Sequence, residues 1–301
     1  MRHAFFVILG AGLWATDTLF RHPLSQELSA VTIVYYEHLF AVLISLAWVL
    51  ISDRKALFPG WREFVGAAFI GIFGSAWATV LFTLSFRYLN PTVAILVQKI
   101  QPVIVIAISA AFLGEKPGRG FLLWGALAMI SAFFVSFPEG VEWRLLRSAS
   151  TLGTLLAVLA AGLWAISTVL GKIVLKKTPV SVLSFWRFAF GLLTLHLITL
   201  KFDQVRIEMP FVLHEPRVLY SLFFMAVIPG FLGVMLYYKG LSRVHAARAT
   251  LLELSFPLAA LWINSAFLGL HLKQAQLFAA GALLVSMVGV SLDQIKARSK
   301  N

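Results

Sequence analysis

The pentapeptide Ala11-Gly12-Leu13-Trp14-Ala15 occurs a second time, unchanged, at Ala161-Gly162-Leu163-Trp164-Ala165. The tetrapeptide Ala111-Phe112-Leu113-Gly114 likewise recurs at 266–269. The offsets are 150 residues (161 − 11) and 155 residues (266 − 111), each about half of the 301-residue chain. The chain is therefore predicted to be two copies of one unit joined head to tail, with its functional site between them.

The composition places this duplicated unit in a membrane. Hydrophobic residues make up 60% of the chain, charged residues only 13%, and the mean hydropathy is +0.88. Long apolar runs alternate with short polar breaks, and each run reaches the ~20 helical residues that cross a bilayer. The runs are continuous rather than alternating, which predicts spanning helices and not strands. Ten spans are predicted, at residues 4–21, 31–51, 64–86, 91–113, 119–137, 152–173, 179–200, 218–238, 246–268 and 272–292.

The net charge of +12 reflects membrane topology rather than nucleic-acid binding. The Lys and Arg residues lie in the polar breaks between spans and form no single basic face or tail. With the N-terminus in the cytoplasm, the inner segments hold more Lys and Arg residues than the outer loops do. Arg21 is assigned to an outer loop in this count. This bias predicts that both termini are cytoplasmic.

Each predicted half holds five spans, residues 1–140 and residues 151–293. An odd number of spans forces the second copy to enter the membrane from the opposite side, so the two repeats are inverted. Inverted duplication in so apolar a chain is typical of secondary transporters. The two repeated motifs align Trp14 with Trp164, Thr18 with Thr168, Glu37 with Arg187, Phe82 with Tyr237, Gln98 with Glu253 and Pro102 with Pro257.

The order of these motifs resembles the drug/metabolite transporter superfamily, EamA type. The resemblance rests on the repeated Gly-Leu-Trp-Ala, on Pro102-Val103 followed by Phe112-Leu113-Gly114-Glu115, and on the run 184–190 around Arg187. It covers nearly the whole chain and is greatest to bacterial exporters of amino acids and metabolites, which implies export across the inner membrane. The chain departs from the pattern at Glu37, where the second repeat has Arg187, and at Leu270, where the first repeat has Glu115.

Five ionisable residues are predicted to lie inside spans, where each costs roughly 2.5–3.5 kcal/mol at the bilayer centre. Counting from the span ends places three of them in the outer half and two in the inner half. The alignment then predicts an outer pair Glu37–Lys99 and an inner pair Arg187–Glu253, which either gate the two sides or statically neutralise buried charge. A direct Glu37–Arg187 contact is a competing geometry. The five residues are Asp17, Glu37, Lys99, Arg187 and Glu253.

Aromatic and polar residues at matched positions predict a substrate cavity between the repeats. Aromatic walls with a few polar anchors suit an amphipathic organic molecule, and Trp and Tyr faces attract ammonium groups. The alternative is that the polar side chains join helices and that the tryptophans pack where helices approach closely. The residues predicted to bind substrate are Trp14, Thr18, Trp77, Phe82, Gln98, Trp164, Thr168, Tyr237 and Glu253.

Pro102 and Pro257 are predicted to interrupt the fourth and ninth spans at matched positions, as static bends or as flexing points of a gate. The chain has no cysteine. Its histidines show no ligand spacing, and no phosphate-binding glycine loop is present, so no metal, cofactor or direct use of ATP is expected.

The sequence therefore predicts a secondary carrier rather than an enzyme. It would export amino acids or related small metabolites by alternating access through the central cavity, as a monomer in the lipid bilayer with no nucleic-acid partner. The alternative is an exporter of cationic drugs or dyes, for which Asp17 and Glu253 supply the opposite charge. A channel is disfavoured because bulky aromatic side chains would block a continuous pore.

Overall fold

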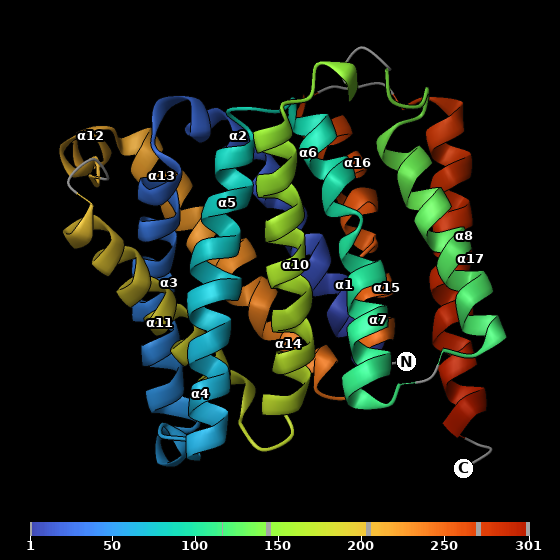
Figure 1. The fold of residues 1–301 in the computed structure, drawn as a ribbon, viewed down its shortest axis with the longest axis horizontal. Helices are drawn as coiled ribbons and strands as arrows, with labels where there is room; N and C mark the ends of the chain where they lie inside the picture. Colours follow the sequence, from blue (N-terminus) through green and yellow to red (C-terminus); the bar gives the residue numbers. More distant parts are fainter. Residues whose placement is uncertain (1, 116, 143–145, 203–205, 269–271, 299–301) are drawn as a thin grey trace.

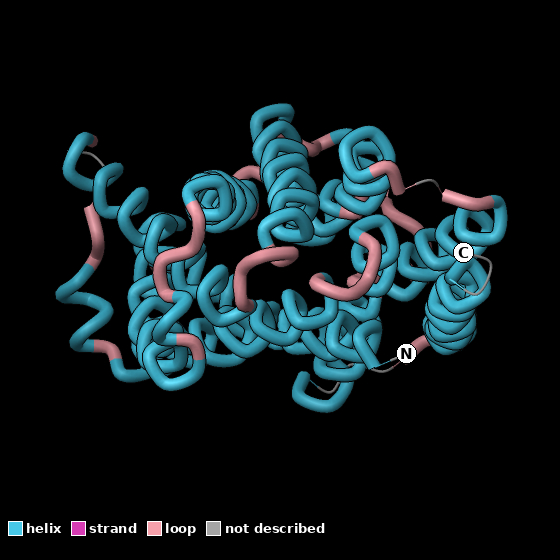
Figure 2. The backbone as a smooth tube through the Cα atoms, turned by 90° about the horizontal axis from the view of Figure 1, so that it is seen from below, coloured by secondary structure: helices cyan, strands magenta, loops and turns pink. Residues whose placement is uncertain are grey.

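A computed structural model of the chain describes residues 2–115, 117–142, 146–202, 206–268 and 272–298, and a few side chains within helices, that of Thr18 among them, lie outside this description. The described residues form helices and no strands, as Figure 1 shows from the side and Figure 2 along the spans. The predicted all-helical fold is confirmed.

Ten helices are long and apolar enough to cross a membrane, which confirms the predicted number. Both termini lie toward the same end of the bundle (Figure 1), as an even number of spans requires. The ten spans are Arg2–Glu27, Ala30–Ser52, Trp61–Ser85, Val93–Leu113, Arg119–Ser136, Thr151–Val174, Val180–Lys201, Pro216–Leu241, Ala246–Phe267 and Gln274–Leu292.

Several spans consist of more than one helical element. In the first half the elements are α1 (Arg2–Trp14), η1 (Ala15–Asp17), α2 (Thr18–Glu27), α3 (Ala30–Ser52), η2 (Arg54–Ala56), α4 (Trp61–Phe69), η3 (Ile70–Trp77), α5 (Ala78–Ser85), α6 (Pro91–Gln98), α7 (Gln101–Leu113) and α8 (Arg119–Ser136). In the second they are α10 (Thr151–Val174), α11 (Val180–Lys201), α12 (Met209–His214), α13 (Pro216–Met225), η4 (Ala226–Gly233), α14 (Val234–Leu241), α15 (Ala246–Leu252), α16 (Ser255–Leu268) and α17 (Gln274–Arg298).

The fourth and ninth spans are each broken just before their proline. The first break, at Lys99-Ile100, separates α6 from α7, and the second, at Glu253-Leu254, separates α15 from α16. A proline offers no N–H to the carbonyl four residues earlier, and its ring clashes with that carbonyl. The predicted interruptions at Pro102 and Pro257 are confirmed, and their role in gating stays a prediction.

The third and eighth spans share a second feature, which the sequence analysis did not predict. Each contains an eight-residue π-helical segment, η3 in the first half and η4 in the second. Glycine lets η3 approach its neighbour, because a Cβ at Gly71 would lie 2.6 Å from the carbonyl oxygen of Arg187. Wide π turns occur often at functional sites. Their presence at matched positions makes the third and eighth spans candidates to contribute to the functional site.

The two halves interlock rather than lie side by side. Span 2 packs on span 7 (α3 on α11), and span 5 packs on span 10 (α8 on α17). Spans 5 and 10 form one edge of the molecule in Figure 1. The first span of each half crosses the third span of the other: α1 packs on η4 and α14, and α10 on η3 and α5. Residues of the first and third spans therefore meet at the boundary between the repeats.

The outer surface of the bundle is apolar. Large side chains such as Ile51, Phe112 and Phe278 are more than three-quarters exposed, at 83%, 78% and 80%. In water such a surface would drive association, whereas in a bilayer it contacts lipid. The functional polar groups are accordingly found inside.

Candidate functional site

The repeated tryptophans form two equivalent aromatic pairs across the repeat boundary. Trp14 on α1 lies against Tyr237 on α14, with ring centroids 4.9 Å apart. Trp164 on α10 lies against Phe82 on α5, with ring centroids 5.2 Å apart. Because Trp14 aligns with Trp164 and Phe82 with Tyr237, the pseudo-two-fold axis relates one pair to the other.

Glu253 stands at the break of the ninth span and is held by neutral groups. The Tyr237 hydroxyl donates to Glu253 Oε1 at 2.5 Å, and Gln101 Nε2 donates to Oε2 at 3.4 Å. Thr168 on α10 lies beside the same tyrosine hydroxyl. These residues and Trp14 come from spans 1, 4, 6, 8 and 9, and we call the five together (Trp14, Gln101, Thr168, Tyr237 and Glu253) the central cluster.

The glycines of the repeated motif are not required by close packing. A Cβ added at Gly162 would meet no atom within 4 Å, and one at Gly12 would meet only the Ala259 Cβ at 3.8 Å. The close crossing of spans 1 and 8 occurs instead at Gly10, where a Cβ would lie 2.8 Å from the carbonyl oxygen of Gly233. Open space therefore lies beside Gly162, whereas Gly12 faces Ala259 at an ordinary contact distance.

Trp77, Gln98 and Thr18, also predicted to bind substrate, are not part of the central cluster. Trp77 ends η3 and is 37% exposed, and half-buried Gln98 ends α6 immediately before the break. The Thr18 side chain lies outside the described part of the chain. A role for these residues in binding stays a prediction.

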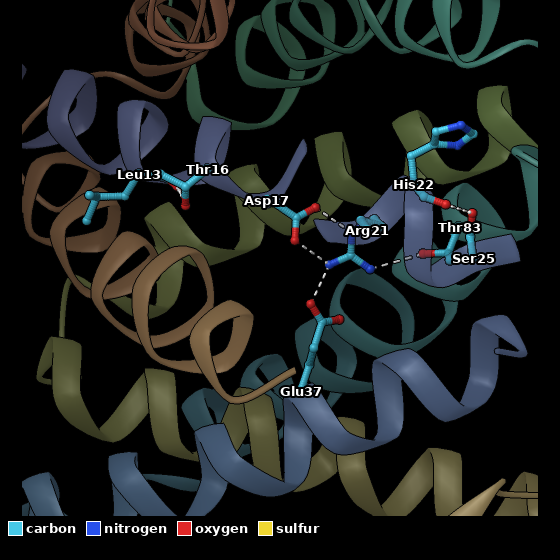
Figure 3. A network of polar contacts seen from close by, with 8 residues as sticks. All are labelled: Leu13, Thr16, Asp17, Arg21, His22, Ser25, Glu37 and Thr83. Carbon is cyan, nitrogen blue, oxygen red and sulfur yellow. Dashed lines mark hydrogen bonds and ion pairs between the residues drawn. The ribbon is translucent and has the colours of Figure 1, made fainter. Parts of the chain in front are cut away.

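Two acids and one arginine form a second, buried cluster (Figure 3). Arg21 Nε and Nη2 donate to the two Asp17 oxygens at 2.5 and 3.0 Å, and Nη2 also donates to Glu37 Oε1 at 2.5 Å. Nη1 donates to Thr83 Oγ1 at 3.1 Å. We call Asp17, Arg21, Glu37 and Thr83 the acid cluster; its formal charge is −1.

The placement of Arg21 in an outer loop is wrong. The first span continues past its predicted end at residue 21 as far as Glu27, so the guanidinium points into the bundle and Arg21 is only 8% exposed. The predicted pair Glu37–Lys99 is wrong for the same reason, because Arg21 already binds Glu37. Lys99 Nζ instead lies 5.5 Å from the centroid of the Phe256 ring.

The predicted pair Arg187–Glu253 is also wrong. Arg187 Nε donates to Ser75 Oγ at 3.1 Å, and Nη1 donates to the Tyr238 hydroxyl at 2.9 Å. Tyr237 and Tyr238 are neighbours on α14 and face different directions, so one holds the acid and the other the arginine. The competing contact between Glu37 and Arg187 does not form either, since each has other partners.

Ser75 also joins Arg187 to a histidine. His38 Nε2 lies 2.9 Å from Ser75 Oγ, and Nδ1 lies 2.8 Å from the Val34 carbonyl oxygen. A carbonyl only accepts, so Nδ1 carries a hydrogen. We call His38, Ser75, Arg187 and Tyr238 the hydroxyl cluster; it ties α3, η3, α11 and α14 together.

Glu115, which closes the Phe-Leu-Gly-Glu motif, has a structural role. Its carboxylate accepts from the backbone N–H groups of Ala246 and Ala247 at 2.9 and 3.0 Å and so caps α15. The corresponding Gly269-Leu270 of the second half lies outside the described residues.

Sequence reasoning missed several functional candidates. The spacing of Asp17 and Arg21, four residues apart on a helix, was a usable signal for their pair. Nothing in the local sequence linked Ser75 or Tyr238 to Arg187, since only the fold brings these residues together. Among the described residues, no group of three or more His, Asp or Glu side chains could hold a metal ion.

Comparison with known proteins gives the family. Residues 1–137 and 151–292 both match the EamA-like transporter family. The riboflavin transporter ImpX of Fusobacterium nucleatum is 26% identical, with 97% of this chain and 98% of that protein covered. The uncharacterized inner membrane transporter YhbE of Escherichia coli K12 is 28% identical over 54% of this chain and 52% of its own length.

The fold is also found among solved structures. A crystal structure of a protein at 16% identity superposes with a TM-score of 0.73, covering 96% of this chain and 95% of that one. Because both halves match the family and ten apolar helices carry them, the chain belongs to the EamA-like transporter family, within the drug/metabolite transporter superfamily, and is a multi-pass inner-membrane transporter of small molecules.

Proposed function

We propose that this carrier exports amino acids or related small metabolites from the cytoplasm by alternating access through a cavity at the central cluster. The observation that carries the proposal is Glu253, an acid at a helix break on the repeat boundary, beside an aromatic pair. Transporter sites typically lie at such breaks, near the midplane between inverted repeats. One chain supplies both walls of the cavity, so the monomer is the functional unit and no cofactor takes part.

The central cluster has the chemistry to bind an amine. Glu253 has only neutral hydrogen-bond partners, so its charge can be matched by a substrate ammonium. The rings of Trp14 and Tyr237 lie beside it and add cation–π attraction. The second aromatic pair, Phe82 with Trp164, offers an apolar wall for the rest of the substrate.

The other two clusters would act as gates. Glu37 of the acid cluster lies seven residues after the start of α3, and Arg187 of the hydroxyl cluster lies seven residues after the start of α11. The hydroxyl cluster also takes His38 and Ser75 from the first half, so it joins the two repeats. Breaking one while the other holds would open one side of the bundle only. The bends at Pro102 and Pro257 would absorb the motion.

Riboflavin is a second candidate substrate. The two aromatic pairs favour a planar ring system, and the relative ImpX is named as a riboflavin transporter. Riboflavin is uncharged at neutral pH, so its transport would depend on the tryptophans more than on Glu253. Transport of the cationic drugs or dyes, the alternative predicted from the sequence, would depend on both the tryptophans and Glu253.

Counterflow in liposomes containing the purified protein tests the proposal. The panel holds amino acids, riboflavin and a cationic dye, with and without a pH gradient. For an amino-acid carrier, Glu253→Gln and Trp164→Ala should each lower flux at least tenfold, because each removes a group that contacts substrate, whereas the exposed Glu27→Gln should leave flux unchanged. Wild-type flux through folded Glu253→Gln and Trp164→Ala would contradict the site.

A further inference from the structure

Lys99 occupies the break of the fourth span, in the turn between α6 and α7. Its backbone N–H bonds to the Leu96 carbonyl at 3.0 Å, which fixes the turn. The side chain is half-buried, inside the Val93–Leu113 span. A lysine at this depth is costly and calls for a partner.

The described part of the chain supplies Lys99 with no anionic partner. Its recorded contact is with the ring of Phe256, 5.5 Å from Nζ. Two acids are the natural candidates, and both have other partners. Glu37, the predicted partner of Lys99, binds Arg21. Glu253, at the equivalent break of the ninth span, binds Tyr237 and Gln101. An aromatic face stabilises a cation without neutralising it.

The break that carries Lys99 faces the break that carries Glu253. Gln101, two residues after Lys99, donates to Glu253, and Phe256, three residues after Glu253, contacts Lys99. The two pseudo-equivalent breaks therefore place a cation and an acid at one interface, each without an ionic partner in the described chain. A solute carrying both charges, or a negative charge alone, could complete the site.

We propose that Lys99 binds the anionic group, a carboxylate or a phosphate, of the transported solute. With Glu253 binding an ammonium, the pair would select zwitterions such as amino acids over amines of the same shape. This proposal rests on the proposed function. It explains why a carrier with Glu253 at its centre would transport amino acids as well as simple cations.

Ligand-induced shifts in thermal midpoint test the subsite without requiring transport. The purified full-length protein is heated with 3-phenylpropionate, phenyl phosphate or phenethylamine at matched ionic strength. One or both anions should raise the midpoint of the wild type and of Lys99→Arg, and should fail to raise that of Lys99→Met. Phenethylamine should stabilise wild type and Lys99→Met alike. Lys177→Met, at a side chain that is 77% exposed, is the control and should respond as wild type.

Each outcome decides the proposal. A shift with 3-phenylpropionate alone assigns a carboxylate, and one with phenyl phosphate alone a phosphate. Equal anion shifts in wild type and Lys99→Met, or no anion shift in wild type, would overturn it. Should Lys99→Met fail to fold, anion shifts shared by wild type and Lys99→Arg, with phenylalanine stabilising wild type more than phenylalaninamide, would support it, and their absence would overturn it.

The same probes separate this proposal from the transport proposal. Liposome flux of phenylalanine without any dependence of anion binding on Lys99 would leave the carrier standing and remove the subsite. Anion binding that depends on Lys99, in a protein that transports none of the amino acids, would support the subsite and contradict amino-acid transport.

Discussion

The acid cluster and the Arg187–Tyr238 contact of the hydroxyl cluster occupy equivalent positions in the two repeats, and His38 and Ser75 of the first repeat complete the second of these clusters. Glu37 and Arg187 each lie seven residues after the first residue of their helix, α3 and α11. Thr83 and Tyr238, at the 155-residue offset, each accept a hydrogen bond from the arginine of their cluster. One guanidinium is therefore found at this interface in both halves.

The arginine comes from a different helix in each half. In the first it is Arg21, on span 1; the aligned position in the second is Gly171, where a Cβ would lie 3.5 Å from Tyr238 Cε1. The second half takes its arginine from span 7 instead, at the position where the first has Glu37. The fold has kept the interface while the charges have moved among the helices that form it.

The exchange leaves the two interfaces electrically unlike. The acid cluster holds two carboxylates around one guanidinium, whereas Arg187 is bound by two hydroxyl oxygens. The bonds of the acid cluster join opposite charges, and a buried charge stripped of its ionic partner is expensive. The acid cluster should therefore be the harder of the two to break.

Arg21→Gln tests this directly and should have the largest effect. It leaves two buried carboxylates facing each other without a cation, which is expected to destabilise the fold by ~3–5 kcal/mol. Thermal unfolding of the purified protein measures it. The matched control is Arg217→Gln, because Arg217 pairs with Glu27 on the surface with its side chain 64% exposed, and exposed pairs contribute about 0–1 kcal/mol.

Restoring neutrality should recover most of that loss. Adding Asp17→Asn and Glu37→Gln to Arg21→Gln removes the stranded charges and leaves groups that can bond to one another. A triple variant no more stable than Arg21→Gln would show that the arginine acts by packing rather than by charge, and the comparison of the two clusters would fail.

Arg187→Gln should have an intermediate effect. Its partners Ser75 and Tyr238 are neutral, and Ser75 keeps its bond to His38, so no charge is stranded. The expected loss is about 1.5–3 kcal/mol, the range for hydrogen bonds made by a charged group. The same thermal assay compares it with Arg21→Gln, and a loss equal to or above that of Arg21→Gln would reverse the ranking.

The spans, their number and their breaks were predictable because each depends on local sequence. Apolar runs determine spans, and a proline interrupts its own helix wherever that helix lies. The aromatic pairs were half predictable: the repeat aligned Trp14 with Trp164 and Phe82 with Tyr237, and only the fold showed that they pair across the boundary.

Apart from the Asp17–Arg21 pair, the charge pairs were not predictable, because they depend on depth and on distant neighbours. The end of the first span was placed at residue 21 rather than Glu27, and this error of one to two turns moved Arg21 into a loop and left Glu37 to pair with Lys99. The repeat alignment paired Arg187 with Glu253, and the π-helical segment that presents Ser75 to Arg187 leaves no clear mark in the sequence. The predicted pairs also joined the same two spans in each half with the signs exchanged, whereas Arg21 on the first span binds Glu37 and hydroxyl groups of the third and eighth spans bind Arg187.

The smallest effects should come from the two aligned hydroxyls, and their order is the finest test of the comparison. Thr83→Val preserves shape and removes one neutral acceptor from Arg21, which keeps three bonds to carboxylate oxygens, so the expected loss is about 0.5 kcal/mol. Tyr238→Phe removes one of the two recorded side-chain partners of Arg187, and the expected loss is about 1 kcal/mol, or roughly 2 °C in thermal midpoint. Tyr238→Phe should therefore lower the midpoint more than Thr83→Val, although both lose one hydroxyl. The opposite order would mean that Arg187 is secured mainly by Ser75 and that the hydroxyl cluster is not the counterpart of the acid cluster.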